Sequence, residues 1–189
     1  MSKNTLKLLS VVVLSYAFLL SSCVQKSSKP TSPKPIKIGA ESQDKSLSSI
    51  DSEIYLGDKL TTLRKIVSSN NKKLSVFQFS GVVCQSCQED SPEVQRQLKQ
   101  LTNVASYVIF PNVEEAYTKD RYLEFVSKYA SGVPYLVDQN LDVLLSVRNP
   151  NIESQFFGIY LIVKPDGTAK ILNEESAFKS VVEEVKKSL

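Results

Sequence analysis

The feature that most constrains the fold of this chain is a pair of cysteines, Cys84 and Cys87, placed between an apolar segment and an amphipathic one. Residues 74–79, LSVFQF, are largely apolar, as in a strand that is buried on both faces. From Cys84 to about residue 100, apolar side chains recur at helical spacing. The cysteines therefore lie where a buried strand gives way to a helix, and the fold must hold both sulfur atoms at the start of that helix.

The chain from residue 50 onward alternates between strand and helix patterns. The expected elements are a helix carrying Leu60, Leu63, Ile66 and Val67 that stops at Asn70-Asn71, the strand 74–79, the helix from residue 84, the strand 105–110, a helix carrying Tyr122, Phe125, Val126 and Tyr129, a short strand 135–137, a short helix 141–147, and a hairpin of strands 159–163 and 168–172 around Pro165-Asp166-Gly167. A last helix is expected to open at Asn173, with Glu174 and Glu175 in its first turn, and to turn its apolar face to the core through Phe178, Val181, Val182 and Val185.

This order of elements predicts an α/β fold with a central mixed β-sheet and helices on both faces. Three apolar strand–helix units in succession favour parallel pairing of the central strands. Hydrophobic residues make up 42% of the chain and charged residues 23%, so a core of this kind can form.

The absence of histidine excludes several classes of site. Ser-His-Asp and Cys-His catalysis, HExxH zinc sites and c-type haem attachment all need it. Three cysteines without histidine do not complete a zinc site, so no metal and no cofactor is expected. The 23 Lys and Arg against 20 Asp and Glu give a net charge of +3, and no basic cluster predicts nucleic-acid binding.

The first 22 residues have the anatomy of a signal peptide. Lys3 and Lys7 precede an apolar run at residues 8–20, which is shorter than the roughly 20 residues of a membrane-spanning helix. The run ends in Leu20-Ser21-Ser22-Cys23, which resembles the bacterial lipobox. That resemblance implies that residues 1–22 are removed and that Cys23 is lipidated as the mature N-terminus. The alternative is an ordinary cleaved signal with an incidental cysteine.

Residues 23–49 are expected to be the lipidated cysteine and an extended tether rich in Ser, Lys and Pro, and residues 50–189 a single folded domain. Lipidation of Cys23 would leave the other two cysteines as one pair. The anchor would hold the domain outside the cytoplasm, where disulfides persist. Val24 rather than aspartate follows Cys23, so by resemblance to Gram-negative lipoproteins we expect the outer membrane, facing the periplasm.

The segment Cys84-Gln85-Ser86-Cys87 at a strand–helix junction favours redox chemistry. A sulfur at a helix N-terminus faces unpaired backbone N–H groups, which favour its thiolate form. The two-residue spacing puts the second sulfur one helical turn further on, close enough to close a disulfide. Cys84 is therefore the candidate attacking thiolate and Cys87 the candidate resolving thiol. The alternatives are half of a metal site, or a static disulfide, which would close too short a loop to add much stability.

The stretch VFQFSGVVCQSCQEDSPEVQRQL resembles the strand–CxxC–helix of the thioredoxin superfamily. More narrowly, it is similar to the membrane-anchored, extracytoplasmic TlpA/ResA-type thioredoxins, in which C-x-x-C-x-x-E-x-P is common. Cys84, Cys87, Asp90 and Pro92 stand at those places in this chain. The resemblance implies a thioredoxin-like fold across residues 50–189 and thiol–disulfide exchange with protein partners.

The chain departs from that family at three places. Val83 stands where a tryptophan is common before the first cysteine, and Gln78 where many thioredoxins bury an acid beneath the cysteines. A proline in a cis bond usually precedes the final hairpin; counting back from the Pro-Asp-Gly turn puts Gly158 at that place, with Pro134 as the alternative. Val83 and Gly158 are thus candidate residues of the substrate groove. Asp90, one helical turn after the second cysteine, is the candidate base for its proton, the alternative being a solvated acid.

The leading hypothesis is a lipid-anchored thiol–disulfide oxidoreductase that acts on extracytoplasmic proteins. Its expected partners are protein thiols and disulfides, the membrane, and a membrane or periplasmic electron donor or acceptor. By resemblance, reductive work in cytochrome c maturation or on mispaired cysteines is favoured over general oxidation. The alternative is a thioredoxin-fold adaptor lipoprotein with an inactive or weakly active site. Copper delivery is disfavoured because histidine is absent and Met1 is the only methionine.

Overall fold

The strand β3 (Leu74–Phe79) lies at the centre of the fold, and all six of its residues are buried. Its side chains alternate between the two faces of the sheet, so Phe77 and Phe79 enter one core while Leu74 and Val76 enter the other. This explains the largely apolar run in the sequence, since neither face of the strand meets solvent. The computed structural model describes residues 48–71, 73–113, 117–150, 156–173 and 177–189.

The strands of the described residues form a seven-stranded sheet in the order β2-β1-β5-β4-β3-β6-β7. β3, β4 and β5 pair in parallel, which confirms the prediction for the central strands. β6 pairs antiparallel with β3, and β1 antiparallel with β5. The other strands are β1 (Glu53–Leu56), β2 (Lys59–Thr62), β4 (Val104–Pro111), β5 (Tyr135–Asp138), β6 (Tyr160–Val163) and β7 (Ala169–Leu172).

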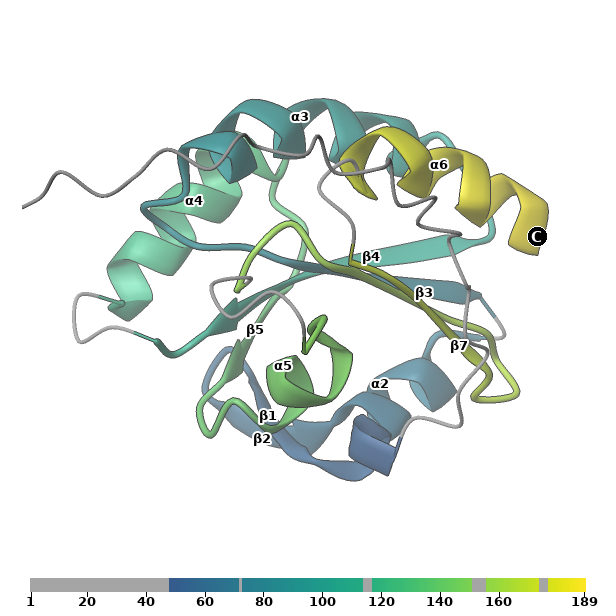
Figure 1. The fold of residues 1–189 in the computed structure, drawn as a ribbon, viewed down its shortest axis with the longest axis horizontal. Coiled ribbons are helices and arrows are strands. Elements are labelled where there is room, and N and C mark those ends of the chain that lie inside the picture. The colour runs from purple at the N-terminus through teal and green to yellow at the C-terminus, as the bar shows by residue number, and fades with distance from the viewer. Residues whose placement is uncertain (1–47, 72, 114–116, 151–155, 174–176) are drawn as a thin grey trace, which may run out of the picture. The chain divides into compact units, whose positions relative to one another are not determined.

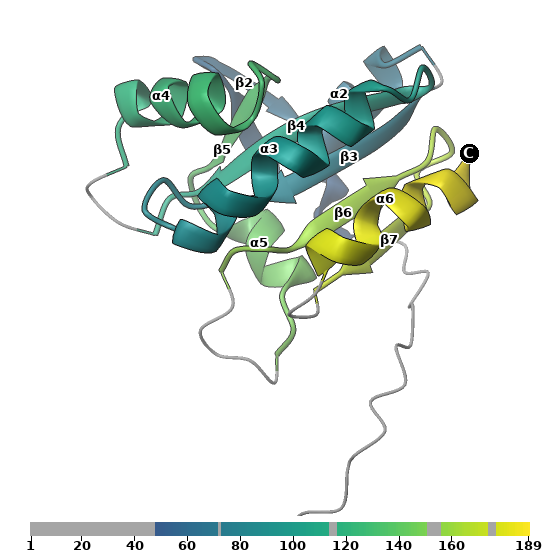
Figure 2. The ribbon, with the colours of Figure 1, turned by 90° about the horizontal axis from the view of Figure 1, so that it is seen from above.

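Helices cover both faces of this sheet (Figure 1), as predicted. The 3₁₀ helix η1 (Ser48–Asp51), α2 (Leu63–Ser69) and α5 (Asp142–Val147) pack on one face. On the other face lie α3 (Gln85–Lys99), α4 (Lys119–Tyr129) and α6 (Ala177–Ser188), which Figure 2 shows from above. Among the helices of the described residues, each is too short or too polar to cross a membrane.

The predicted helix around Leu60 begins later than expected. Leu60 lies in β2, paired with Tyr55 of β1, and the helix α2 starts at Leu63. The physical reason is the Thr62 cap: its backbone is extended, and its hydroxyl accepts the Lys65 N–H at 3.2 Å, so the helix begins directly after it. The hairpin of β1 and β2 turns at Gly57, whose φ of +59° suits glycine. Sequence periodicity had assigned Leu60 to the helix because its spacing also fits.

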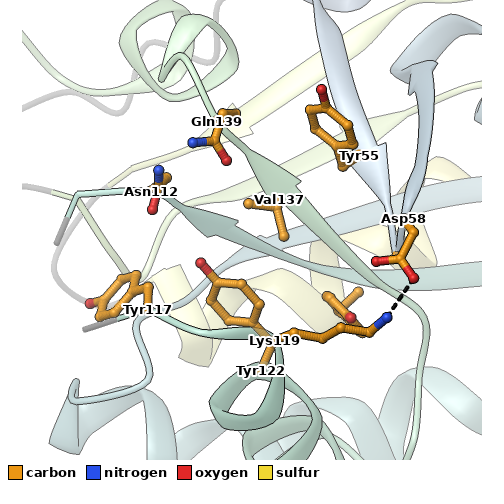
Figure 3. Close-up of a pocket in the computed structure, with 10 residues that line it drawn as sticks. Tyr55, Asp58, Asn112, Tyr117, Lys119, Tyr122, Val137 and Gln139 are labelled. Carbon is orange, nitrogen blue, oxygen red and sulfur yellow. Dashed lines mark hydrogen bonds and ion pairs between the residues drawn. The ribbon is translucent and has the colours of Figure 1, made fainter. Parts of the chain in front are cut away.

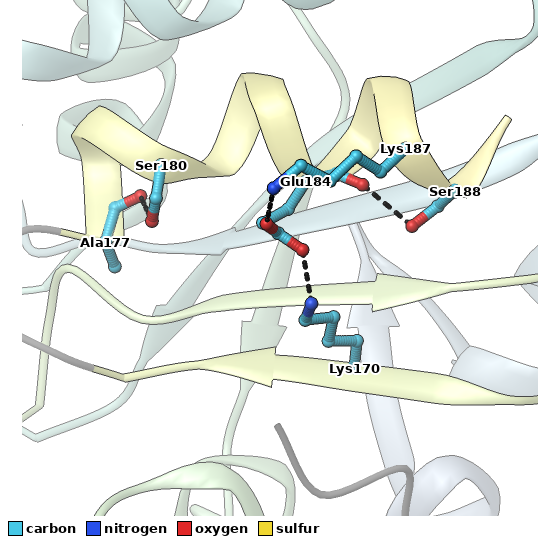
Figure 4. A network of polar contacts seen from close by, with 6 residues as sticks. All are labelled: Lys170, Ala177, Ser180, Glu184, Lys187 and Ser188. Atoms are coloured by element: carbon cyan, nitrogen blue, oxygen red, sulfur yellow. Dashed lines mark hydrogen bonds and ion pairs between the residues drawn. The ribbon is translucent and has the colours of Figure 1, made fainter. Parts of the chain in front are cut away.

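An ion-pair network fixes α6 to the sheet (Figure 4). Glu184 of α6 accepts hydrogen bonds from Lys170 of β7 and from Lys187 one turn further along the helix. These two contacts, that of Lys170 first, hold the pKa of the Glu184 carboxyl below its usual range. Val181, Val182 and Val185 are buried beneath the helix, which confirms its predicted apolar face.

Several predicted features lie outside the described residues. They are the signal peptide 1–22, the cysteine proposed for lipidation, Cys23, the greater part of the tether 23–49, and the two glutamates expected to open the last helix, Glu174 and Glu175.

Candidate functional site

Cys84 and Cys87 form a disulfide at the N-terminus of α3. Cys84 is the N-cap residue, with extended backbone, and its Sγ accepts a hydrogen bond from the Cys87 N–H at 3.2 Å. Their Cα atoms lie 5.2 Å apart. The strand β3 ends five residues before Cys84, so the central strand and the helix together fix both sulfur atoms.

The two cysteines differ in exposure. Cys84 is half-buried, and Val83 before it is 53% exposed, so an exposed apolar side chain precedes the outer sulfur. Cys87 is only 5% exposed and belongs to the core cluster that includes Val82 and Phe110. A partner sulfur can therefore approach Cys84 from solvent, whereas Cys87 is reached mainly through Cys84.

Asp90 is half-buried on the side of α3 that faces β6 and α6. Burial raises the pKa of its carboxyl, the charge of Glu89 raises it further, and Lys179 of α6 opposes both effects. Its charge also adds to the effect of burial in raising the pKa of Tyr160. Within the described residues no hydrogen bond or ion pair joins Asp90 to either cysteine, so a proton passing between them would need a water molecule or a side-chain movement.

A buried polar network lies beneath the cysteines, between β3 and α3. Gln78, 2% exposed, donates through its amide to the hydroxyl of Ser91, one helical turn beyond Cys87, and more weakly to Ser80. It accepts a hydrogen bond of 2.9 Å from Gln95, whose own amide oxygen is buried without a partner among the described residues. Sequence reasoning singled out Gln78 alone. The sequence also contains a signal for the other two members of the network. Ser91 and Gln95 are polar residues four apart on the face of α3 that is buried.

Gly158 stands two residues before the start of β6 and beside the end of β3. Its N–H donates to the Phe79 carbonyl at 3.1 Å, and its φ is +74°, in the left-handed region that favours glycine. The neighbouring Phe157 ring lies so close to Gly81 that a Cβ there would come within 2.5 Å of it. The segment before β6 therefore packs on the loop that leads into the CxxC.

Pro134 occupies a different place. It precedes β5, and its carbonyl accepts the Val108 N–H at 3.1 Å in the middle of β4. Because β4 lies between β5 and β3 in the sheet, Pro134 is separated from the CxxC loop by a whole strand. The structure thus brings Val83 and Gly158 to the region of the disulfide and leaves Pro134 away from it. No group of three or more metal-ligating side chains occurs within the described residues.

No protein-family model matches the chain, and no curated protein matches its sequence. Solved structures do resemble it. DsbF of Mycobacterium tuberculosis, solved in mixed oxidized and reduced forms, is 17% identical with a TM-score of 0.58, covering 75% of this chain and 97% of its own. A secreted disulfide oxidoreductase of Mycobacterium tuberculosis homologous to Escherichia coli DsbE is also 17% identical, with a TM-score of 0.55 and coverage of 74% and 97%.

A further similar structure is the exposed lipoprotein thioredoxin Etrx1 of Streptococcus pneumoniae, 16% identical with a TM-score of 0.50 over 71% of this chain and 97% of its own. Identities this low establish shared architecture and leave function to the site itself. The mixed sheet with helices on both faces agrees with these neighbours. The chain has the thioredoxin-like α/β fold.

Proposed function

We propose that the protein is a thiol–disulfide oxidoreductase that exchanges disulfides with protein partners. The observation that carries this proposal is the Cys84–Cys87 disulfide at the N-terminus of α3, with its outer sulfur half-exposed and its inner sulfur buried. A helix N-terminus favours the thiolate at Cys84, and burial keeps Cys87 for attack on Cys84. The thioredoxin-like fold, which a secreted disulfide oxidoreductase shares at 17% identity, supports the same chemistry.

Reduction of a partner would proceed in two exchanges. The Cys84 thiolate attacks one sulfur of the partner disulfide, so a mixed disulfide forms and the partner's other sulfur leaves as a thiolate and takes up a proton. Cys87 then loses its proton and attacks Cys84; the intramolecular disulfide forms, and the partner's first sulfur leaves. Two electrons pass to the partner, and the reverse sequence oxidizes it.

Asp90 is proposed as the base that takes the Cys87 proton. Its raised pKa and half-buried position one turn after Cys87 suit that role. The network of Gln78, Ser91 and Gln95 beneath the cysteines is neutral, and amides and hydroxyls do not accept a proton readily at ordinary pH. Asp90 is therefore the ionisable acceptor that the site offers.

We further propose that the protein is a TlpA/ResA-type lipoprotein. Its signal peptide would be cleaved off, and Cys23 would carry the lipid that anchors it outside the cytoplasm. The basic start, the apolar run 8–20 and the lipobox-like Leu20-Ser21-Ser22-Cys23 support this. The similarity to a pneumococcal exposed lipoprotein thioredoxin and to a secreted oxidoreductase is consistent with it. Its partners would then be extracytoplasmic protein thiols and disulfides, with a membrane or periplasmic protein as the electron donor.

The proposed chemistry is tested by the rate at which the purified protein reduces the disulfide of a protein substrate. With dithiothreitol as reductant, Cys84→Ser should abolish turnover, because no attacking thiolate remains. Asp90→Asn should lower it about tenfold, below the usual 10²–10⁴ for general-base help because solvent reaches the site. Since the Asp90 pKa is raised, the wild-type rate should climb with pH through that raised value, and Asp90→Asn should lack this limb.

The matched control for Asp90 is Glu89→Gln, which removes a neighbouring exposed acid and, at a pH where Asp90 is ionised, should leave turnover within about twofold. Equal turnover by wild type and Cys84→Ser would refute an enzymatic role and leave the disulfide as a structural bond.

Lipid attachment is tested in cells fed labelled palmitate. Wild-type protein should incorporate the label and sediment with membranes, whereas Cys23→Ala should do neither, because the thiol that receives the lipid is gone. Label that persists in Cys23→Ala would contradict the lipobox interpretation, and Ser22→Ala serves as a control that keeps a small residue before the cysteine.

A further inference from the structure

A pocket of about 560 Å³ lies between α4 and the strands β1 and β5, apart from the disulfide (Figure 3). Figure 3 shows Tyr55 and Tyr122 on either side of Val137, with the Asp58–Lys119 ion pair at one end. Four of its ten lining residues are tyrosines, and polar side chains make up much of the rest; aromatic faces of this kind suit apolar or planar groups. The lining residues that the argument uses are Tyr55, Tyr117, Tyr122, Tyr135, Asn112 and Gln139.

The pocket is open because α4 leaves the edge of the sheet uncovered. Leu60, Tyr55 and Val137 stand directly opposite one another on β2, β1 and β5, so they form a row on one face. That face is the one against which α4 packs, since Val137 shares a core cluster with Phe125. Leu60 is 46% and Tyr55 37% exposed. Leu60 and Tyr55 are thus adjacent exposed side chains beside the buried Val137, an exposed apolar surface that another molecule can cover.

The charges of the pocket select a neutral occupant. Asp58 and Lys119 pair with each other at the rim, so neither presents an uncompensated charge to a ligand. The polar groups left to bond to the N–H and C=O groups of an extended peptide are hydroxyls and amides, those of Tyr55, Tyr122, Tyr135, Asn112 and Gln139. The aromatic faces match an aromatic or large aliphatic side chain.

The position of the pocket relates it to the disulfide. Asn112 follows β4 and Gln139 follows β5, so both lie at the sheet edge where β3 runs into the CxxC. Adjacent strands are about 4.8 Å apart, so the end of β5 is roughly 10 Å from the end of β3, and β1 is one spacing further. An extended peptide covers about 3.3 Å per residue, so about three to five residues bridge this distance.

We propose that this pocket binds a client polypeptide, taking an aromatic or large aliphatic side chain that lies about three to five residues from the cysteine engaged at Cys84. The inference rests on the proposed thiol–disulfide exchange and adds its substrate class. Val83, exposed beside the disulfide, offers a second apolar contact close to the reacting sulfur. Clients with charged or small residues at those positions would react more slowly, although the chemistry at sulfur is the same.

The test uses single-cysteine peptides of thirteen residues, each held as a mixed disulfide with 2-mercaptoethanol. Phenylalanine stands three, four or five residues before or after the cysteine, and serine replaces it in the reference peptide. The second-order rate of oxidation of the reduced protein should be about tenfold higher for at least one phenylalanine peptide than for the reference, as burial of a phenyl ring allows. Tyr55→Ala should reduce that preference to less than about threefold, because it opens the aromatic wall.

Two controls separate this inference from the proposed chemistry. The rate with 2-hydroxyethyl disulfide, which cannot reach the pocket, should be the same for wild type and Tyr55→Ala, which also shows that the variant is folded. Leu145→Ala removes an exposed apolar side chain from α5 on the opposite face and should keep the preference. If wild type reacts equally with every peptide, the pocket does not bind clients. If it reduces neither the peptides nor 2-hydroxyethyl disulfide, the proposed function fails as well.

Discussion

Cys87→Ala is expected to accumulate covalent complexes with natural partners. The variant keeps the half-exposed Cys84, the proposed attacking thiol, but it lacks the buried thiol proposed to resolve the mixed disulfide. The complexes should appear as high-mass bands on non-reducing gels of native membranes and should separate on reduction, with wild type giving almost none. Mass spectrometry of the bands would identify the partners.

Two further variants make the trapping experiment decisive. Cys84→Ser/Cys87→Ala has no attacking sulfur and should trap nothing. Cys84→Ser/Cys87→Ser should also lose partner association if binding depends on exchange. Partner binding that survives in this variant, together with an empty trap in Cys87→Ala, would favour the adaptor hypothesis over the oxidoreductase.

Phe110→Ala is expected to cause a large loss of stability. Phe110 of β4 is fully buried and stacks on Tyr122 with ring centroids 4.7 Å apart. It also meets the edge of Phe125 at 5.4 Å and tilts against Tyr135 at 6.2 Å. Removing the ring leaves a cavity beneath α4, and such substitutions cost about 3–5 kcal/mol of unfolding free energy.

Chemical denaturation followed by circular dichroism measures this loss. Leu145→Ala, on the 51% exposed side chain of α5, should change the unfolding free energy by less than about 0.5 kcal/mol and serves as the control. Tyr122 and Tyr135 line the pocket and also contact Phe110. Phe110→Ala should therefore also weaken the preference for phenylalanine peptides. A loss below about 1 kcal/mol would mean that α4 collapses onto β4 and fills the space.

The sequence alone was sufficient for features that depend on neighbouring residues. The apolar run 74–79 followed by Cys84 and Cys87 predicted a buried strand entering a helix, and β3 and α3 have that arrangement. Successive strand–helix units predicted the parallel centre of the sheet. Such features follow from periodicity and capping, which act over one or two turns of chain.

The predicted start of α2 was wrong because it was inferred from local periodicity alone. Leu60 fits the helical spacing of Leu63 and Ile66, but the Thr62 cap and pairing with β1 hold it in a strand. Strand pairing of this kind depends on a second segment, so a pattern read along one segment does not contain it.

Only the tertiary structure decided which residues surround the disulfide and the pocket. Gln78 meets Ser91 and Gln95 because β3 happens to lie under α3, and Phe157 closes on Gly81 because β6 pairs with β3 after 80 residues of intervening chain. The tyrosine pocket requires β1 to pair with β5, which are likewise distant in sequence. Local patterns report that a side chain is buried, whereas the order of strands in the sheet determines what it is buried against.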